Sequence, residues 1–120
     1  MDFTTKKCVP CEGGEDPLKR DKIDEYRKAI NPQWEIIDVD CNSRSTRIIE
    51  DKALRRVFKF PSFKEAIEFV NKVADLAEDE GHHPDFRINY KKVTLELTTH
   101  AIGGLSENDF VMAAKIEQIL

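Results

Sequence analysis

The sequence contains little cysteine and no long apolar run. Its three cysteines, Cys8, Cys11 and Cys41, are too few and odd in number for a disulfide framework. They favour a reducing compartment. No apolar stretch approaches the roughly 20 residues that a membrane span needs, and residues 1–7 have no hydrophobic signal core. We therefore expect a protein that stays out of membranes and resides in the cytoplasm, with the nucleus as a further possible location.

Positively charged residues are outnumbered by acidic ones. Lysine and arginine number 19 against 23 acidic residues, which gives a net charge of −4. Domains that hold nucleic acid by bulk electrostatics are usually basic, so we expect no direct nucleic-acid binding. The chain has 120 residues, of which 40% are hydrophobic and 35% charged. This balance predicts one globular domain over residues 1–120, with residues 1–16 as an irregular, polar N-terminal arm.

The first half of the chain predicts one helix and two strands. Asp16-Pro17 is typical of a helix N-terminus, and the helix should end near Asn31 because Pro32 follows. Strands are expected over residues 34–39 and 54–60, with an earlier start of the second strand, near Thr46, left open. The polar segment between them makes a long connection.

The second helix has the clearest sequence signals. Ser62 and Glu65 form a capping box at its start, and Gly81 occupies the usual position of a left-handed C-cap. Its predicted buried face contains Phe63, Ala66, Ile67, Val70, Val73, Ala74 and Ala77, with Phe69 and Leu76 toward the edge.

A hairpin and a third helix complete the chain. Alternating residues predict strands over 86–90 and 93–98, joined by a turn at Lys91-Lys92. Gly103-Gly104 then breaks the chain, and Ser106 with Asp109 caps a helix over 106–120. This helix is apolar on nearly every side, so we expect a second subunit to cover part of it. The order αββαββα predicts an α+β fold, a four-stranded antiparallel sheet with three helices packed on one face.

All three histidines lie between residues 82 and 100. His82 and His83 follow the second helix, and His100 follows the last strand. Because the strands of the second hairpin are antiparallel, these positions can meet at one end of the sheet. Imidazoles there could transfer protons in both directions near neutral pH. The alternative is that each histidine is solvated or binds the terminal carbonyls of a helix.

Two carboxylates lie near these histidines in the predicted fold. Glu78, four residues before His82, could hold an imidazole or a polar ligand group, although a solvated surface glutamate is the simpler interpretation. Asp109 lies in the first turn of a helix, where acidic residues are electrostatically favoured, and it could also orient a histidine.

Cys8-Val9-Pro10-Cys11 has the spacing of a zinc knuckle. His82 and His83 could complete a four-ligand set, but a single CxxC pair is a weak signal, and adjacent histidines rarely both reach one ion.

Several of these motifs together resemble pterin-4a-carbinolamine dehydratases. The resemblance rests on residues 78–84, on Tyr90 and Val93, on Leu97-Thr98-Thr99-His100, and on Gly103-Gly104-Leu105-Ser106 with Asp109. Residues 8–14 and Trp34 are also similar. It covers most of the chain except about residues 38–53, and the connection over about 40–51 is longer than the family's usual short hairpin.

The resemblance implies an αββαββα fold and a hydro-lyase that uses no metal and no cofactor. The implied substrate is 4a-hydroxytetrahydrobiopterin, dehydrated to quinonoid dihydropterin during tetrahydrobiopterin recycling. The implied catalytic residues are His82, His83, His100 and Asp109, and the substrate-binding residues are Glu78, His83, Pro84, Thr98 and Thr99. We hypothesise that His82 and His100 form the proton-transfer pair, that His83 mainly binds the pterin, and that Asp109 orients His100.

The resemblance also bears on partners. It implies a homodimer or homotetramer, which we expect to form through helices that include residues 106–120. Some animal relatives also serve as dimerisation cofactors of a homeodomain transcription factor, but nothing in this sequence points to such a partner. A zinc-stabilised adaptor that uses Cys8 and Cys11 is the third alternative.

Overall fold

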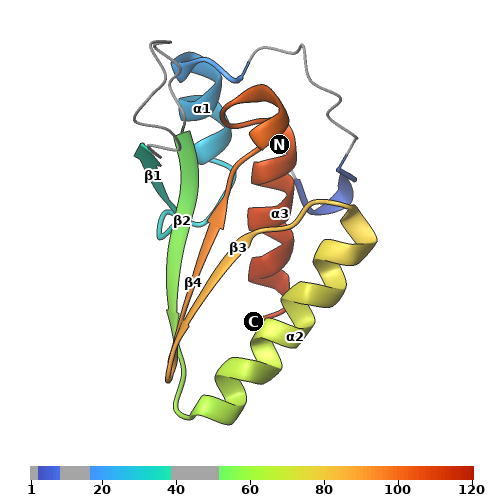
Figure 1. The fold of residues 1–120 in the computed structure, drawn as a ribbon. Coiled ribbons are helices and arrows are strands. Elements are labelled where there is room, and N and C mark those ends of the chain that lie inside the picture. The colour runs from blue at the N-terminus through green and yellow to red at the C-terminus, as the bar shows by residue number, and fades with distance from the viewer. Residues whose placement is uncertain (1–2, 9–16, 39–51) are drawn as a thin grey trace.

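The computed structural model describes residues 3–8, 17–38 and 52–120, and for Asp38, Lys52 and His100 it describes the backbone alone. Three helices cover one face of a four-stranded sheet (Figure 1). The elements are η1 (Phe3–Thr5), α1 (Arg20–Arg27), β1 (Glu35–Asp38), β2 (Lys52–Lys59), α2 (Phe63–Glu80), β3 (Asp85–Asn89), β4 (Lys92–Leu97), η2 (His100–Ile102) and α3 (Glu107–Gln118). The predicted α+β fold and the order of its helices and strands are confirmed. No helix in these ranges is long and apolar enough to cross a membrane.

The sheet has the strand order β1-β2-β4-β3, and every neighbouring pair is antiparallel. In β4, Val93, Leu95 and Leu97 are buried under the helices, whereas Thr94 and Glu96 face outward. This alternation is typical of a sheet with one covered face. The strand β3 lies at an edge, and all five of its residues are exposed.

The first helix is shorter than predicted at both ends. It begins at Arg20 rather than at Pro17, because the N–H of Leu18 donates a hydrogen bond to the carbonyl of Leu105, 2.8 Å away. This bond holds the residues after Pro17 outside the helix and against the segment that leads into α3. The helix ends at Arg27, and the strand that follows begins at Glu35.

The Ser62 N-cap and the Gly81 C-cap of α2 are confirmed, although of the predicted capping box only the Ser62 bond is found, and the buried face is rotated from the predicted one. The Ser62 hydroxyl accepts from the N–H of Glu65, and Gly81 has a φ of 66°. The residues buried are Ala66, Phe69, Val73 and Ala77. Phe69 packs on Phe58 and Phe60, and this contact rotates the helix about its axis. As a result Phe63 is 50% exposed, and Ala74 is also exposed.

The β3–β4 turn is one residue earlier than predicted. Asn89 pairs with Lys92, so the two-residue turn is Tyr90-Lys91 rather than Lys91-Lys92. Tyr90 adopts a φ of 53°, which is unusual for a residue other than glycine. The tight connection between twisted strands requires such a conformation, and here a tyrosine adopts it.

The third helix, α3, is enclosed by other parts of the fold. Residues Asn108 to Ala114 and Ile116 are all buried without a second subunit. Besides β4 and α2, the helix packs against α1 and η1. Its apolar circumference is therefore covered by the chain itself, and the reason for expecting a subunit contact along it is removed.

Part of the predicted irregular arm is ordered core. The Phe3 ring in η1 is 1% exposed, and its centroid lies 5.2 Å from that of Tyr26 and 6.0 Å from that of Phe110. The arm therefore begins with an aromatic anchor that closes the far side of α3. Residues 9–16 of the arm and the predicted 40–51 connection lie outside the described residues.

Candidate functional site

Four chain segments meet at one end of the sheet. Asp85, the first residue of β3, pairs with Glu96, near the end of β4, so the segments before β3 and after β4 lie at the same rim. The first segment is His82-His83-Pro84, and the second is Thr98-Thr99-His100. The C-terminus of α2 and the N-terminus of α3 meet this rim as well (Figure 1). The predicted convergence of residues 82–84 with residue 100 is therefore present in the backbone.

The cap of α2 sets the position of His82. The N–H groups of Gly81 and His82 both donate to the carbonyl of Ala77, and Gly81 takes the left-handed conformation that ends the helix. A side chain on this cap is oriented by rigid backbone rather than by a loose loop.

The His82 imidazole contacts a buried carboxylate. Its Nε2 atom lies 2.6 Å from Oδ1 of Asp109, and the Asp109 side chain is 0% exposed. The sequence-based hypothesis assigned Asp109 to orient His100; the partner found in the structure is His82. An aspartate in this position fixes both the tautomer and the plane of the imidazole.

The other oxygen of Asp109 is held by two donors. Oδ2 accepts from the hydroxyl of Thr99 and from the N–H of Ser106, each at 2.9 Å. Since Thr99 gives its proton to Asp109, the Ser106 hydroxyl donates to Thr99 Oγ1 across 2.8 Å. Asp109 also lies in the first turn of α3, where the helix dipole favours a negative charge. Together these contacts compensate the burial of the carboxylate.

His83 has a different environment. Its Nε2 lies 3.2 Å from Oε1 of Glu78, and the two side chains are 58% and 80% exposed. The two adjacent histidines therefore differ in environment, because one ring is held by a buried aspartate and the other faces solvent. Glu78 is a surface glutamate, as the simpler interpretation had it, and it reaches His83. Pro84, which follows, is buried.

His100 begins η2 directly after the site's threonines. Thr99 pairs with Gly104 through two backbone hydrogen bonds, so residues 100–103 form a small closed loop beside Asp109. Thr98 Oγ1 donates to the carbonyl of Gly104. The backbone of His100 is thus one residue from Thr99, whose hydroxyl binds the same carboxylate as His82.

Cys8 packs beside this cluster but is a poor nucleophile. Its Sγ lies 3.7 Å from the carbonyl of Asn108, and its N–H donates to Oε2 of Glu80. Burial, followed by the charge of Glu80, raises the pKa of the thiol to about 12. Among residues 3–8, 17–38 and 52–120, no three acidic, histidine or cysteine side chains are grouped as metal ligands would be. Cys11, the other half of the proposed zinc pair, lies outside the described residues.

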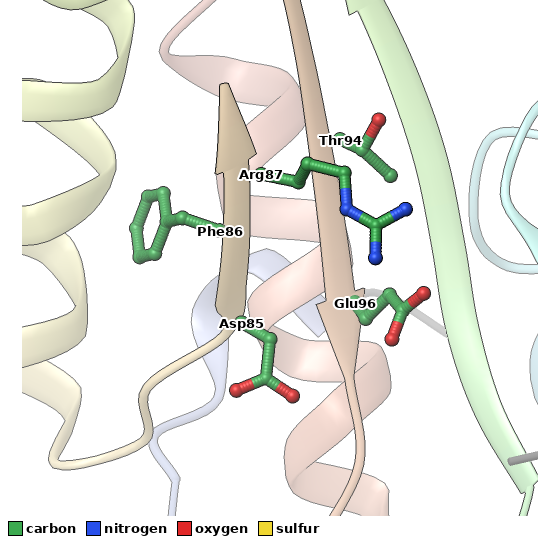
Figure 2. Close-up of a pocket in the computed structure, with 5 residues that line it drawn as sticks. All are labelled: Asp85, Phe86, Arg87, Thr94 and Glu96. Atoms are coloured by element: carbon green, nitrogen blue, oxygen red, sulfur yellow. The ribbon is translucent and has the colours of Figure 1, made fainter. Parts of the chain in front are cut away.

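A small pocket lies on the opposite, outer face of the sheet. Figure 2 shows Arg87, Thr94 and Glu96 on that face, with Phe86 pointing the other way, toward α2. The cavity measures about 70 Å³ and also contacts Asp85. None of the histidines lines it, so it is separate from the His82–Asp109 cluster.

Sequence reasoning missed several residues that build the site. The Ser106 hydroxyl, beyond its role as a helix cap, supports Thr99. Glu80 and Lys115 form a nearly buried ion pair beside Cys8. No local pattern marks these contacts, because each joins residues that are distant in sequence or belong to different elements.

Comparison with known proteins agrees with this geometry. A family profile described as "Pterin 4 alpha carbinolamine dehydratase" matches residues 16–119. A relative from Alkaliphilus metalliredigens is 43% identical over 94% of this chain and 91% of its own length, and one from Rubrobacter xylanophilus is 38% identical over 98% of both. Both are named after pterin-4-alpha-carbinolamine dehydratase.

A solved structure is similar in fold as well as in sequence. It is described as a transcriptional coactivator/pterin dehydratase from Brucella melitensis. It superposes with a TM-score of 0.69 at 31% identity and covers 87% of this chain and 98% of its own.

Proposed function

Because this chain belongs to the pterin 4 alpha carbinolamine dehydratase family and is a dehydratase, we propose that it converts 4a-hydroxytetrahydrobiopterin to quinonoid dihydropterin and water by histidine acid/base chemistry. In this proposal the enzyme acts in tetrahydrobiopterin recycling. The contact of 2.6 Å between His82 Nε2 and Asp109 Oδ1 carries the assignment of the chemistry.

The reaction needs one proton donor and one proton acceptor. The hydroxyl on C4a leaves as water once it is protonated, and a ring nitrogen of the pterin loses a proton as the new double bond forms. Both transfers suit an imidazole near neutral pH. His82 meets the requirement because Asp109 engages its Nε2, which leaves Nδ1 as the nitrogen that exchanges a proton with the substrate.

His100 is the second member of the proton-transfer pair. Its backbone follows Thr99, whose hydroxyl binds Asp109, and this places the residue at the same rim as His82. Either histidine can act as the acid, so that the two epimers of the C4a alcohol are both dehydrated.

The remaining residues bind the pterin in this proposal. His83 and Glu78 form an exposed pair next to His82 along the chain and offer a donor and an acceptor to the polar edge of the ring. Thr98 and the segment around Pro84 lie at the same rim. Thr99 is 5% exposed and serves mainly to hold Asp109.

The direct test is a stopped-flow assay on a synthetic 4a-carbinolamine. The His82→Ala and His100→Ala variants are each expected to lose about 10²–10⁴-fold in dehydration rate, and the double variant is expected to fall below both. His83→Ala is expected to raise KM more than it lowers kcat. Turnover at the wild-type rate in both single variants would refute the proton-transfer assignment.

Self-association is a second property that the surface favours. Four large apolar side chains, Phe63, Phe86, Ile88 and Tyr90, are 38–68% exposed on α2, on β3 and in the turn that follows β3. As an edge strand, β3 can pair with another strand. We propose that a homo-oligomer forms here rather than along α3. Light scattering coupled to size exclusion tests this. The molar mass of the wild type is expected to exceed the 13.8 kDa of one chain, and the molar mass of Ile88→Lys is expected to fall toward that value. A strictly monomeric wild type would exclude it.

The coactivator description belongs to the Brucella protein. No contact among the described residues points to a homeodomain partner for this chain.

A further inference from the structure

An ion pair joins the end of α2 to α3 away from solvent. Lys115 Nζ donates to Oε1 of Glu80, and the two side chains are 13% and 8% exposed. The second oxygen of Glu80 accepts from the backbone N–H of Cys8 at 2.9 Å, which ties the N-terminal arm to the same carboxylate. The Glu80 carboxylate therefore holds three segments together: the arm, α2 and α3.

The ionised state of Glu80 depends on these contacts. Burial by itself would raise the pKa of this carboxyl. Lys115, the Cys8 N–H and the charge of Lys7 outweigh burial and hold the pKa below its ordinary value. A buried pair of this kind is weak evidence for stability, because desolvation offsets much of the attraction. Its best-attested use is to specify one geometry among several.

Glu80 and Lys115 lie close along the chain to His82 and Asp109, respectively. Glu80 is the last residue of α2, and only the rigid Gly81 cap separates it from His82. Lys115 is on the same helix as Asp109, six residues later. The end of α2 and the helix α3 thus meet at two points, Glu80–Lys115 and His82–Asp109, and fixing the first restricts the second.

Apolar packing does not supply this restriction. Burial of apolar surface is non-directional, so a helix can slide or rotate slightly while keeping its buried area. Proton-transfer groups must be held within about 0.5 Å of their productive geometry. A charged hydrogen bond has the direction that apolar contacts lack.

We propose that Glu80 and Lys115 are positioning residues that hold the end of α2 against α3 so that His82 meets Asp109. This inference rests on the proposed function, because it assigns the pair a role through His82. Neither side chain needs to contact the pterin.

The test compares three variants: one that removes a single charge, one that conserves it, and one that removes both charges. Lys115→Met leaves Glu80 buried without its cation and is expected to destabilise the fold, whereas Lys115→Arg keeps the charge and is expected to retain activity. The decisive variant is Glu80→Met/Lys115→Met. An apolar pair of similar volume is often neutral or stabilising in place of a buried ion pair. It is expected to unfold at a higher urea concentration than Lys115→Met, although the Cys8 N–H loses its acceptor, and to lose at least about tenfold in kcat with KM nearly unchanged while still folded.

A matched control and a spectroscopic readout complete the design. Lys6 and Glu107 form another ion pair between the arm and α3, with side chains 46% and 42% exposed. Lys6→Met is therefore expected to leave kcat within about twofold, as a surface pair contributes little. The ¹H resonance of the His82 Nε2 proton is identified by its absence from His82→Ala. In Glu80→Met/Lys115→Met this resonance is expected to shift or broaden.

The outcomes separate the two proposals. A double variant with wild-type kcat and an unshifted His82 resonance would overturn the positioning role, even with His82→Ala inactive. A fully active His82→Ala would instead overturn the proposed proton-transfer role and the positioning role that depends on it.

Discussion

His82 Nε2 and Asp109 Oδ1 lie 2.6 Å apart, although the two residues are separated by 27 positions and belong to the ends of different helices. The contact joins the C-terminal cap of α2 to the first turn of α3. It makes the histidine at this rim part of a hydrogen-bonded network that continues through Asp109 to Thr99 and Ser106.

Replacing Asp109 by asparagine should separate orientation from folding. Asparagine keeps the shape of the side chain but cannot accept at both positions as a carboxylate does, so the His82 tautomer is no longer fixed. We expect kcat to fall by about 10²-fold or more, within the range for loss of an acid/base group. Stopped-flow measurement of carbinolamine dehydration checks this value. The control is Glu107→Gln, in the same helical turn but partly exposed, which should retain wild-type kcat.

Replacing Thr99 by valine should affect stability and activity together. The change removes the hydroxyl that donates to Asp109 and accepts from Ser106, and it leaves both groups short of a partner in a buried place. The free energy of unfolding is expected to fall by about 1–3 kcal/mol. Urea titration followed by tryptophan fluorescence measures it. Thr94→Val, on the outward face of β4, is the matched control, and an equal loss there would contradict the network's role.

Phe3→Ala should show that the N-terminal segment belongs to the core. The ring is 1% exposed and packs on Tyr26 and Phe110, so its removal leaves a cavity. The expected loss is about 3–5 kcal/mol of unfolding free energy. Phe63→Ala, at a ring that is 50% exposed, should cost much less. Equal midpoints for the two variants in urea would mean that Phe3 does not anchor the arm.

Cys8 should make stability fall at high pH. Its pKa is raised from 9.0 to about 12, first by burial, so the folded state holds the thiol proton more tightly than the unfolded chain does. The corresponding stabilisation is complete below pH 9 and is lost as the pH rises from 9 toward 12. Urea midpoints at pH 8, 9 and 10 should fall more steeply for the Cys11→Ser/Cys41→Ser protein than for one that also carries Cys8→Ala. Parallel curves would contradict the assignment.

The Cys11→Ser/Cys41→Ser protein, in which Cys8 is the remaining cysteine, also allows a chemical test of the thiol. Because the thiolate is the reactive form, Cys8 should resist iodoacetamide at pH 8 in the folded protein and react after unfolding in urea. Rapid alkylation of the native protein would be inconsistent with a buried, protonated sulfur.

Local sequence signals predicted the helix ends that depend on neighbouring residues. Ser62, Gly81 and the Ser106–Asp109 cap are all found as expected, since each cap involves backbone groups within one helical turn. The predicted start of α1 was wrong because a long-range hydrogen bond from the Leu18 N–H to the Leu105 carbonyl competes with the local proline signal. The rotation of α2 followed from an aromatic contact between Phe69 and β2 that no helical periodicity contains.

The helix over 106–120 shows the same limit at a larger scale. Its apolar circumference correctly indicated burial on several sides. The sequence-based interpretation assigned the cover of those sides to another subunit. In the structure, η1, α1 and α2 of the same chain cover them. The burial of Phe3, a residue of the arm, against Phe110 of α3 explains the difference, since a single phenylalanine in a polar segment gives no periodic signal.

By itself, the sequence determined the α+β class, the order of helices and strands, the caps and the set of histidines, because these depend on composition, periodicity and short-range hydrogen bonds. Only the tertiary structure decided which carboxylate meets which imidazole: Asp109 contacts His82, Glu78 contacts His83, and Glu80 contacts Lys115. Such pairs join side chains brought together by the packing of whole elements, and a shift of one helix by a fraction of a turn would break these contacts without changing any local pattern.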